Sequence, residues 1–212
     1  MKKNVIVTIG RSIGAGGLEV AKKLSDRISV EMFDRELILL AAKESGIDLS
    51  FLENNDEKPA SKGKFFRFFG AKNSPYGNDM NGGYSNNILS DDRLFGIQSD
   101  VMLEIASKKS CIFVGRCADY ILRDCPNLFS VFIQADLEDR IARISQNRGI
   151  TPEEAEKFIE KAERRRREYY NYYTFKQWGD SASYDLCLST TCFGVDGCVD
   201  MIIDGLTKKG LI

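Results

Sequence analysis

Residues 4–18 carry the types and spacing best suited to chemistry in this chain. A short apolar run, Val5 to Ile9, predicts a buried strand, and a helical apolar pattern begins at Leu18. Between them lies a turn with four glycines: Gly10, Gly14, Gly16 and Gly17. Glycines let successive backbone N–H groups point into one concavity, and the helix N-terminus adds a partial positive charge. The stretch therefore predicts a phosphate-binding loop, although no lysine follows the glycines as in G-x-x-x-x-G-K-[ST].

Charged side chains follow two other predicted strands. Asp34 and Arg35 come directly after the second strand, and Arg116 and Asp119 follow the third. Ligands of parallel α/β sheets gather beyond the carboxyl ends of the strands, so these side chains are expected to meet the glycine turn at one rim. Arginine forks bind phosphate, and carboxylates read a base or sugar or hold a metal.

A run of four arginines, 164–167, forms a second basic feature. On a helix, Arg164 and Arg167 share a face, so together they could clamp one anion. The alternative is a solvated helix face whose arginines pair with neighbouring glutamates: Glu160, Glu163 and Glu168.

The composition excludes several classes of site. The chain has 212 residues, a net charge of -1 and no histidine, which rules out Ser-His and Cys-His nucleophiles and ordinary Cys/His zinc sites. The six cysteines include no C-x-x-C and predict reduced, mostly buried thiols. We find neither a signal peptide nor a membrane span, and we expect a cytoplasmic protein that binds neither nucleic acid nor membrane. Oligomeric state stays open.

Helices and strands alternate along the chain in a pattern typical of a parallel α/β sheet covered on both faces. Strands are expected at 4–9, 29–33, 111–115, 128–134 and 184–189. Helices are expected at 15–27, 35–45, 48–54, 90–109, 136–148, 151–173 and 195–208.

Residues 56–88 differ in composition from the rest of the chain. From Asn73 to Asn87 they are dense in Gly, Asn and Ser, which predicts a mobile loop. The preceding phenylalanines and basic residues of 62–69 suit a short amphipathic helix, with a basic–aromatic nucleic-acid surface as the less favoured alternative.

The chain resembles the cytidylate kinase-like family, a branch of the P-loop nucleoside monophosphate kinases. The resemblance is carried by four segments that run from the N-terminus to the last strand: Ile9–Gly17, Phe33–Ile38, Val114–Asp119, and the tail that contains Arg167–Thr174, Trp178–Asp180 and Tyr184–Leu186.

The resemblance implies a single three-layer P-loop kinase domain over 1–212, with a five-stranded parallel sheet flanked by helices. The core would comprise 1–34, 109–149 and 179–212. A mobile acceptor-binding insert would span 35–108, and a lid would span 150–178.

The resemblance also implies roles for individual residues. The phosphates of ATP would lie on Gly10, Arg11, Ser12, Gly14, Ala15, Gly16 and Gly17, and Ser12 would contact the Mg²⁺ bound to ATP. The acceptor nucleotide would face Asp34, Arg35, Arg116 and Asp119. Arg140 and Arg143 would flank the ATP base or phosphates. The catalytic charges would be Arg11, Arg116, Arg164 and Arg167.

Two departures from the family pattern bear on activity. Gly17 and Leu18 stand where ordinary cytidylate kinases carry Lys and a small hydroxyl residue, so Arg11, Ser12 or the lid arginines would have to substitute. Asp119 lies three residues after Arg116 rather than next to it, and this spacing weakens the argument that the acceptor base is cytosine.

The first hypothesis is an ATP- and Mg²⁺-dependent kinase acting on CMP or dCMP. The alternatives are a nucleotide-binding regulator without kinase activity and a kinase for another small acceptor.

Overall fold

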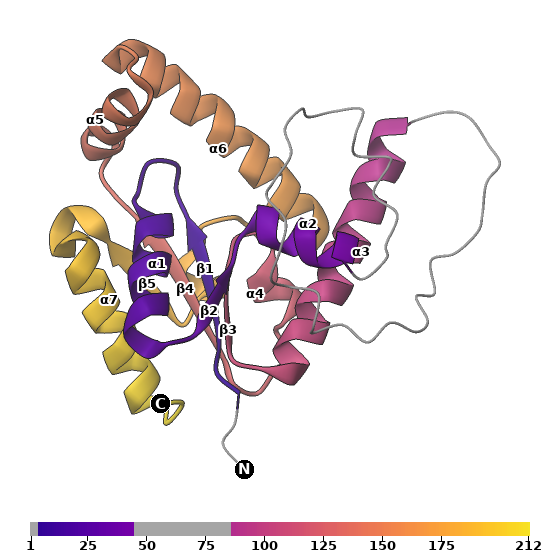
Figure 1. The fold of residues 1–212 in the computed structure, drawn as a ribbon. Coiled ribbons are helices and arrows are strands. Elements are labelled where there is room, and N and C mark those ends of the chain that lie inside the picture. The colour runs from indigo at the N-terminus through magenta and orange to yellow at the C-terminus, as the bar shows by residue number, and fades with distance from the viewer. Residues whose placement is uncertain (1–3, 45–85) are drawn as a thin grey trace.

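The computed structural model describes residues 4–44 and 86–212. Five strands form one parallel sheet in the order β2-β3-β1-β4-β5 (Figure 1). Their bounds are β1 Ile6–Arg11, β2 Glu31–Phe33, β3 Cys111–Val114, β4 Leu128–Gln134 and β5 Leu186–Ser189. This confirms the predicted three-layer α/β fold with a five-stranded parallel sheet.

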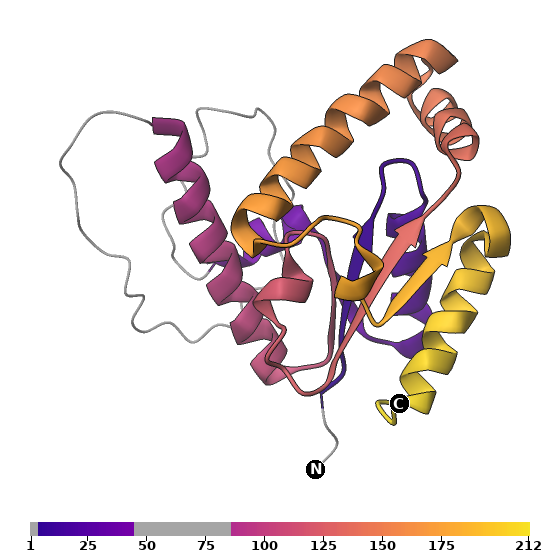
Figure 2. The same cartoon turned by 180° about the vertical axis from the view of Figure 1, so that it is seen from behind.

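Helices cover both faces of the sheet. Their bounds are α1 Gly17–Ile28, α2 Arg35–Glu44, α3 Asn86–Lys108, α4 Ala118–Ile121, α5 Leu137–Arg148, α6 Pro152–Thr174 and α7 Thr190–Lys208, with a short 3₁₀ turn, η2, at Ser181–Ser183. α1 and α7 lie side by side on one face, and α3 and α4 lie on the other (Figures 1 and 2). The long helix α6 crosses above the carboxyl ends of the strands.

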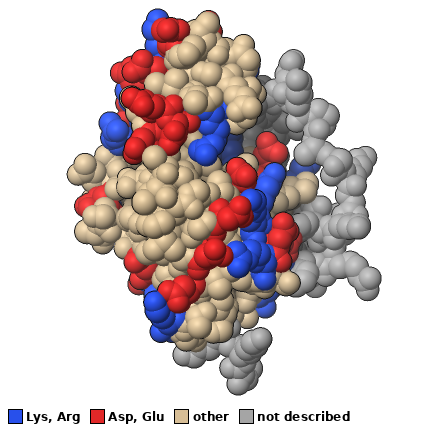
Figure 3. All heavy atoms as spheres, turned by 90° about the vertical axis from the view of Figure 1, so that its left-hand side faces the viewer, with Lys and Arg blue, Asp and Glu red and all other residues tan. Residues whose placement is uncertain are grey.

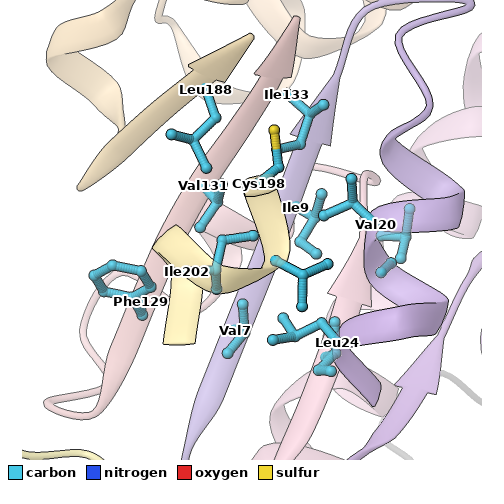
Figure 4. Packing of buried hydrophobic residues seen from close by; sticks show 14 of the residues in the cluster. Val7, Ile9, Val20, Leu24, Phe129, Val131, Ile133, Leu188, Cys198 and Ile202 are labelled. Atoms are coloured by element: carbon cyan, nitrogen blue, oxygen red, sulfur yellow. The ribbon is translucent and has the colours of Figure 1, made fainter. Parts of the chain in front are cut away.

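Two hydrophobic clusters hold these layers together. The first joins β1, β4 and β5 to α1 and α7, and Val7, Ile9, Leu24 and Ile202 meet at its centre (Figure 4). The second joins β2 and β3 to α2, α3 and α4 around Phe113. Alternate residues of β1 face opposite clusters, as expected for a strand buried on both faces.

Several element boundaries differ from the prediction. β1 continues past Ile9 because Gly10 and Arg11 still pair with β4. The helix expected from residue 90 begins at Asn86 instead, and α4 was not expected. α7 begins before the predicted residue 195 and contains a break at Gly194, whose backbone is not helical.

α6 begins with a capping box. The Thr151 side chain accepts a hydrogen bond from the Glu154 amide, and the Thr151 amide donates one to Glu154 Oε2. The expected helix at 48–54, the phenylalanine cluster at 62–69 and nearly all of the 56–88 loop lie outside the described residues.

The face that carries α1 and α7 shows acidic and basic side chains next to one another (Figure 3). Two ion pairs there, Lys23–Asp196 and Arg27–Asp200, link the two helices. No described helix combines the length and the apolar character that crossing a membrane requires.

Candidate active site

The glycine turn joins the end of β1 to the start of α1. Gly14 and Gly16 have φ values of 78° and 76°, which L-residues rarely adopt. A Cβ at Gly14 would also lie 2.9 Å from the Arg140 carbonyl oxygen. The turn can therefore form, and pack against α5, only with glycine at this position.

A first pocket of about 470 Å³ opens over this turn. Its lining comes from the turn, α1, α5 and α6: Arg11, Ser12, Ile13, Gly14, Gly16, Gly17, Leu18, Glu19, Lys22, Arg143, Ile144, Asn147, Arg148, Phe158 and Arg166. Among the described lining residues, five side chains are cationic and only Glu19 is acidic, so the pocket is suited to a polyanion.

A second pocket of about 400 Å³ lies at the carboxyl ends of β1 and β3. It is lined by Gly10, Arg11, Arg35, Gly115, Arg116, Cys117, Asp119, Arg165, Arg166, Tyr169, Tyr170, Trp178 and Tyr184. In the described part of the chain, five arginines and four aromatic side chains surround it, and Asp119 is the only acidic residue among them. This combination fits a ligand that carries both a planar ring and negative charge.

Arg11 and Arg166 line both pockets. Arg166 Nη1 donates to the Arg11 carbonyl at 3.0 Å, which ties α6 to the end of β1. Burial, and then the mutual repulsion with Arg166 and Arg116, lowers the pKa of Arg11 to about 9. Burial, followed by repulsion from Arg116, also lowers the pKa of Arg166. Both remain cationic at neutral pH, so positive charge concentrates where the pockets meet.

The turn after β3 directs Arg116 into the second pocket. Gly115, Arg116 and Cys117 are three consecutive residues with positive φ, of 75°, 58° and 55°. Left-handed backbone is unfavourable for the latter two residues, and such strain clusters at functional sites. The Arg116 guanidinium lies over the Tyr169 ring, 5.6 Å from its centroid.

Asp119 is held by tyrosine. The Tyr170 hydroxyl donates to Asp119 Oδ2 at 2.6 Å. Burial raises the pKa of Asp119, and the hydrogen bond from Tyr170 only partly offsets it. Burial beside Asp119 also raises the pKa values of Tyr170 and Tyr184.

A carboxylate ties α6 to the glycine turn. Glu163 of α6 accepts a hydrogen bond from the Ile13 amide at 3.2 Å and pairs with Arg140 at 2.5 Å. Arg143 donates to the Gly14 carbonyl at 2.6 Å. The turn is therefore held from α5 and α6 as well as by its own backbone.

The structure brings most of the predicted residues to the two pockets, with four exceptions among the charged ones. Asp34 accepts hydrogen bonds from the Glu36 and Leu37 amides and so caps α2. Arg140 pairs with Glu163. Arg164 and Arg167 are exposed and line neither pocket.

Two of the predicted glycine-turn residues also lie elsewhere than over the first pocket. Ala15 is fully buried, and its carbonyl accepts a hydrogen bond from Thr190. Gly10 lines the second pocket, where a Cβ would lie 2.8 Å from the Phe132 ring. Their roles in binding phosphate stay predictions.

Sequence reasoning missed several pocket residues: Lys22, Arg148, Phe158, Arg165, Arg166, Tyr169, Tyr170, Trp178 and Tyr184. The arginine run was recognised, but four consecutive helical residues cover more than half of the circumference. Only the packing of α6 reveals that Arg166 faces the pockets. The aromatic tail was visible as part of the family resemblance, although no pattern assigned those rings to a pocket.

The pockets offer no activated nucleophile among their described residues. Burial raises the pKa of Cys117 to about 12, so its thiol is neutral. No cluster of three or more Cys, Asp or Glu side chains suited to a metal occurs among residues 4–44 and 86–212. Among the described residues of the first pocket, the oxygen-bearing side chains that could face a nucleotide-bound cation are Ser12, Glu19 and Asn147.

The chain is similar to known proteins in sequence and in fold. A curated cytidylate kinase from Thermococcus kodakarensis (strain ATCC BAA-918 / JCM 12380 / KOD1) is 28% identical over 112 residues, which are 51% of this chain and 56% of that protein. The match thus spans a little more than half of the relative's length.

Two solved structures share the fold. An uncharacterized protein from Eubacterium ventriosum ATCC 27560 is 27% identical, with a TM-score of 0.72 over 96% of this chain and 99% of that one. A shikimate kinase from Bacteroides thetaiotaomicron is 12% identical, with a TM-score of 0.53 over 96% of this chain and 98% of that one.

The sequence model of the Cytidylate kinase-like family matches residues 6–192. That span includes the glycine turn, the turn after β3, the arginine run of α6 and every residue that lines the two pockets. The chain therefore belongs to the cytidylate kinase-like family.

Proposed function

We propose that the protein is an ATP-dependent phosphotransferase that phosphorylates a nucleoside monophosphate, with CMP or dCMP as the first candidates. The observation that carries the proposal is that two pockets adjoin and share Arg11 and Arg166. A donor in one pocket and an acceptor in the other would have their phosphates next to each other at these two guanidinium groups. Direct transfer requires such an approach.

The first pocket fits the donor. Its glycine turn leads into the N-terminus of α1, and its cationic lining exceeds its acidic lining by four side chains, five against one. Both features favour a triphosphate. Mg²⁺ would arrive with ATP and neutralise phosphate charge, and the Ser12 and Glu19 side chains, which line this pocket, would be the groups to contact it.

The second pocket fits the acceptor. Arg35 and Arg116 repel each other, and an acceptor phosphate between them would relieve that repulsion. The aromatic side chains give a nucleobase surfaces to stack on. Asp119 offers a carboxylate oxygen to a base amino group, although Tyr170 already occupies one of its oxygens.

The residues at the junction act by position and charge. The acceptor oxygen attacks the terminal phosphorus in line, the bond to the bridging oxygen breaks, and ADP leaves with that bond's electrons. Arg11 and Arg166 would hold the negative charge that develops on the transferring group. α6, in the proposed lid 150–178, and the proposed insert 35–108 would exclude water, which otherwise competes as acceptor.

An ADP-release assay over a panel of nucleoside monophosphates tests the proposal. We expect the highest turnover with CMP or dCMP and none without an acceptor. Arg116→Ala should weaken acceptor affinity about tenfold or more and leave ATP affinity within about threefold, since Arg116 lines only the second pocket. Equal loss of both affinities would contradict its assignment, and no turnover with any acceptor would contradict the proposal.

One observation favours a second candidate, a nucleotide-binding protein without kinase activity. Gly17 stands where the standard loop has its lysine, which removes a charge from the β- and γ-phosphates. Calorimetry that shows ATP and CMP binding, together with no turnover in the ADP-release assay, would support this candidate. A kinase for another small acceptor would instead release ADP with a different member of a broader panel.

A further inference from the structure

We propose that Arg11 supplies the phosphate-binding charge that a lysine supplies in a standard P-loop, and that Gly17 is a glycine because the Arg11 side chain occupies its side-chain space. The inference rests on the proposed function, because it takes the first pocket to bind a polyphosphate. It assigns the missing charge to one residue at the end of β1 rather than to the helix that follows the loop.

The evidence begins with the space around Gly17. A Cβ built on Gly17 would lie 2.5 Å from Arg11 Cβ and 2.9 Å from Arg11 Cγ. Real Cβ atoms essentially never come this close to another atom, and these Arg11 atoms belong to the base of its side chain, which cannot swing away. The next atom, Ile133 Cβ, is at an ordinary 3.5 Å. Arg11 alone therefore bars a side chain at position 17.

The backbone of Gly17 gives no other reason for glycine. Gly17 is the first residue of α1, and it is not among the glycines with positive φ. An alanine would suit this helical position better than glycine does. The residue type is thus explained by the neighbour at position 11.

The guanidinium end of Arg11 reaches the turn after β3. A Cβ at Gly115 would overlap Arg11 Nη1 and would lie 3.1 Å from Arg11 Cζ. Position 115 also requires glycine for its φ of 75°. The side chain therefore runs from the end of β1, across the start of α1, to the boundary between the two pockets.

At that boundary the positive charge of Arg11 is available to bind a ligand. Among the residues that the structure describes, no carboxylate lies within ion-pair distance of the Arg11 guanidinium. Asp34 raises the pKa of Arg11, but its effect is smaller than the lowering caused by burial and by the two neighbouring arginines. A buried cation in this situation is stabilised by an anion that enters the pocket.

Lys22 is the competing source of the missing charge. It lies on α1, is exposed, and also lines the first pocket. It lines only that pocket, whereas Arg11 lines both, so Lys22 is not placed to contact a group passing between them.

A thermal-unfolding cycle tests the packing claim without reference to activity. Gly17→Ala should lower the Tm by about 3 °C or more when Arg11 is present. In the Arg11→Gly background, which removes Cβ and Cγ together, the same change should leave the Tm unchanged or raise it. An equal loss in both backgrounds would overturn the claim.

Calorimetry with Mg²⁺-ATP and with inorganic triphosphate tests the charge. Arg11→Gly should weaken the affinity for each ligand about tenfold or more, whereas Lys22→Ala should weaken it less than about threefold. Arg11→Gly/Gly17→Lys should recover a substantial part of the loss, whereas Arg11→Ala/Gly17→Lys, which keeps the obstructing Cβ, should not. Arg27→Ala, which removes a surface charge paired with Asp200, is the charge-matched control and should change neither affinity.

The outcomes separate this inference from the proposed function. If the natural protein binds ATP and turns over while Arg11→Gly keeps full affinity and Lys22→Ala loses it, the inference is overturned and the function stands. If the natural protein binds neither ATP nor triphosphate, the proposed function fails, and the unfolding cycle still decides why position 17 is glycine.

Discussion

At the scale of single residues, the site is built from arginines whose charge is only partly compensated. Arg11, Arg116 and Arg166 repel one another and are all depressed in pKa, chiefly by burial. Keeping like charges together in a partly buried region costs stability, and a bound polyanion would recover that cost. We therefore interpret the cluster as a binding feature rather than as a contribution to folding.

Asp119 should make stability depend on pH in a distinctive direction. Its pKa is raised, chiefly by burial, so its contribution to stability is complete below the ordinary value of 3.8 and is lost as pH rises through the raised value. Asp119→Asn cannot ionise and keeps an oxygen acceptor for Tyr170. Urea unfolding between pH 4 and 8 should show the natural protein losing stability relative to this variant as pH rises.

Asp185 provides a control of opposite sign. Burial works to raise its pKa, but hydrogen bonds from Ser130 and Lys209 outweigh it and lower the pKa. Its contribution is thus present above 3.8 and is lost as pH falls below that value. When the urea series is extended below pH 3.8, Asp185→Asn should therefore lose less stability than the natural protein does. A flat difference between Asp119→Asn and the natural protein between pH 4 and 8 would contradict the assignment for Asp119.

At the scale of elements, sequence patterns predicted the strands well because they are short, largely apolar runs. Three of the five expected runs, at 4–9, 29–33 and 111–115, are followed directly by glycine or a charged residue. The patterns missed α4, which has only four residues and begins after left-handed backbone that no periodicity signals. They also could not fix the rotation of α6, because its arginine run has no single polar face. Packing against β1 and the glycine turn decides which arginine points inward.

That rotation gives a prediction for α6. Arg166→Ala should lower turnover by about 100-fold or more, since Arg166 reaches both pockets and the Arg11 carbonyl. The double change Arg164→Ala/Arg167→Ala removes more charge, and we expect it to lower turnover less than about tenfold because both side chains are exposed. Steady-state kinetics would measure both losses of turnover, with Tm measurements to show that each variant is as stable as the natural protein. A larger loss in the double variant would return the lid role to Arg164 and Arg167.

At the scale of the whole molecule, the parallel sheet explains why distant residues meet. β1 and β3 are neighbours whose carboxyl ends face α6, so Arg11, Arg116 and Arg166 converge from three parts of the chain. The sequence suggested this convergence through the strand-end residues. It did not reveal two adjoining pockets, since their walls depend on how α5 and α6 pack over the sheet.

The most direct measurement of the central claim is calorimetry with a bisubstrate compound, in which adenosine and cytidine are joined through their 5′ oxygens by a polyphosphate chain. If the two pockets adjoin at Arg11 and Arg166 and serve donor and acceptor, the compound should bind one per chain. It should bind at least about tenfold more tightly than ATP, and prior saturation with either ATP or CMP should weaken it. Binding no tighter than ATP, with competition from ATP alone, would contradict the claim.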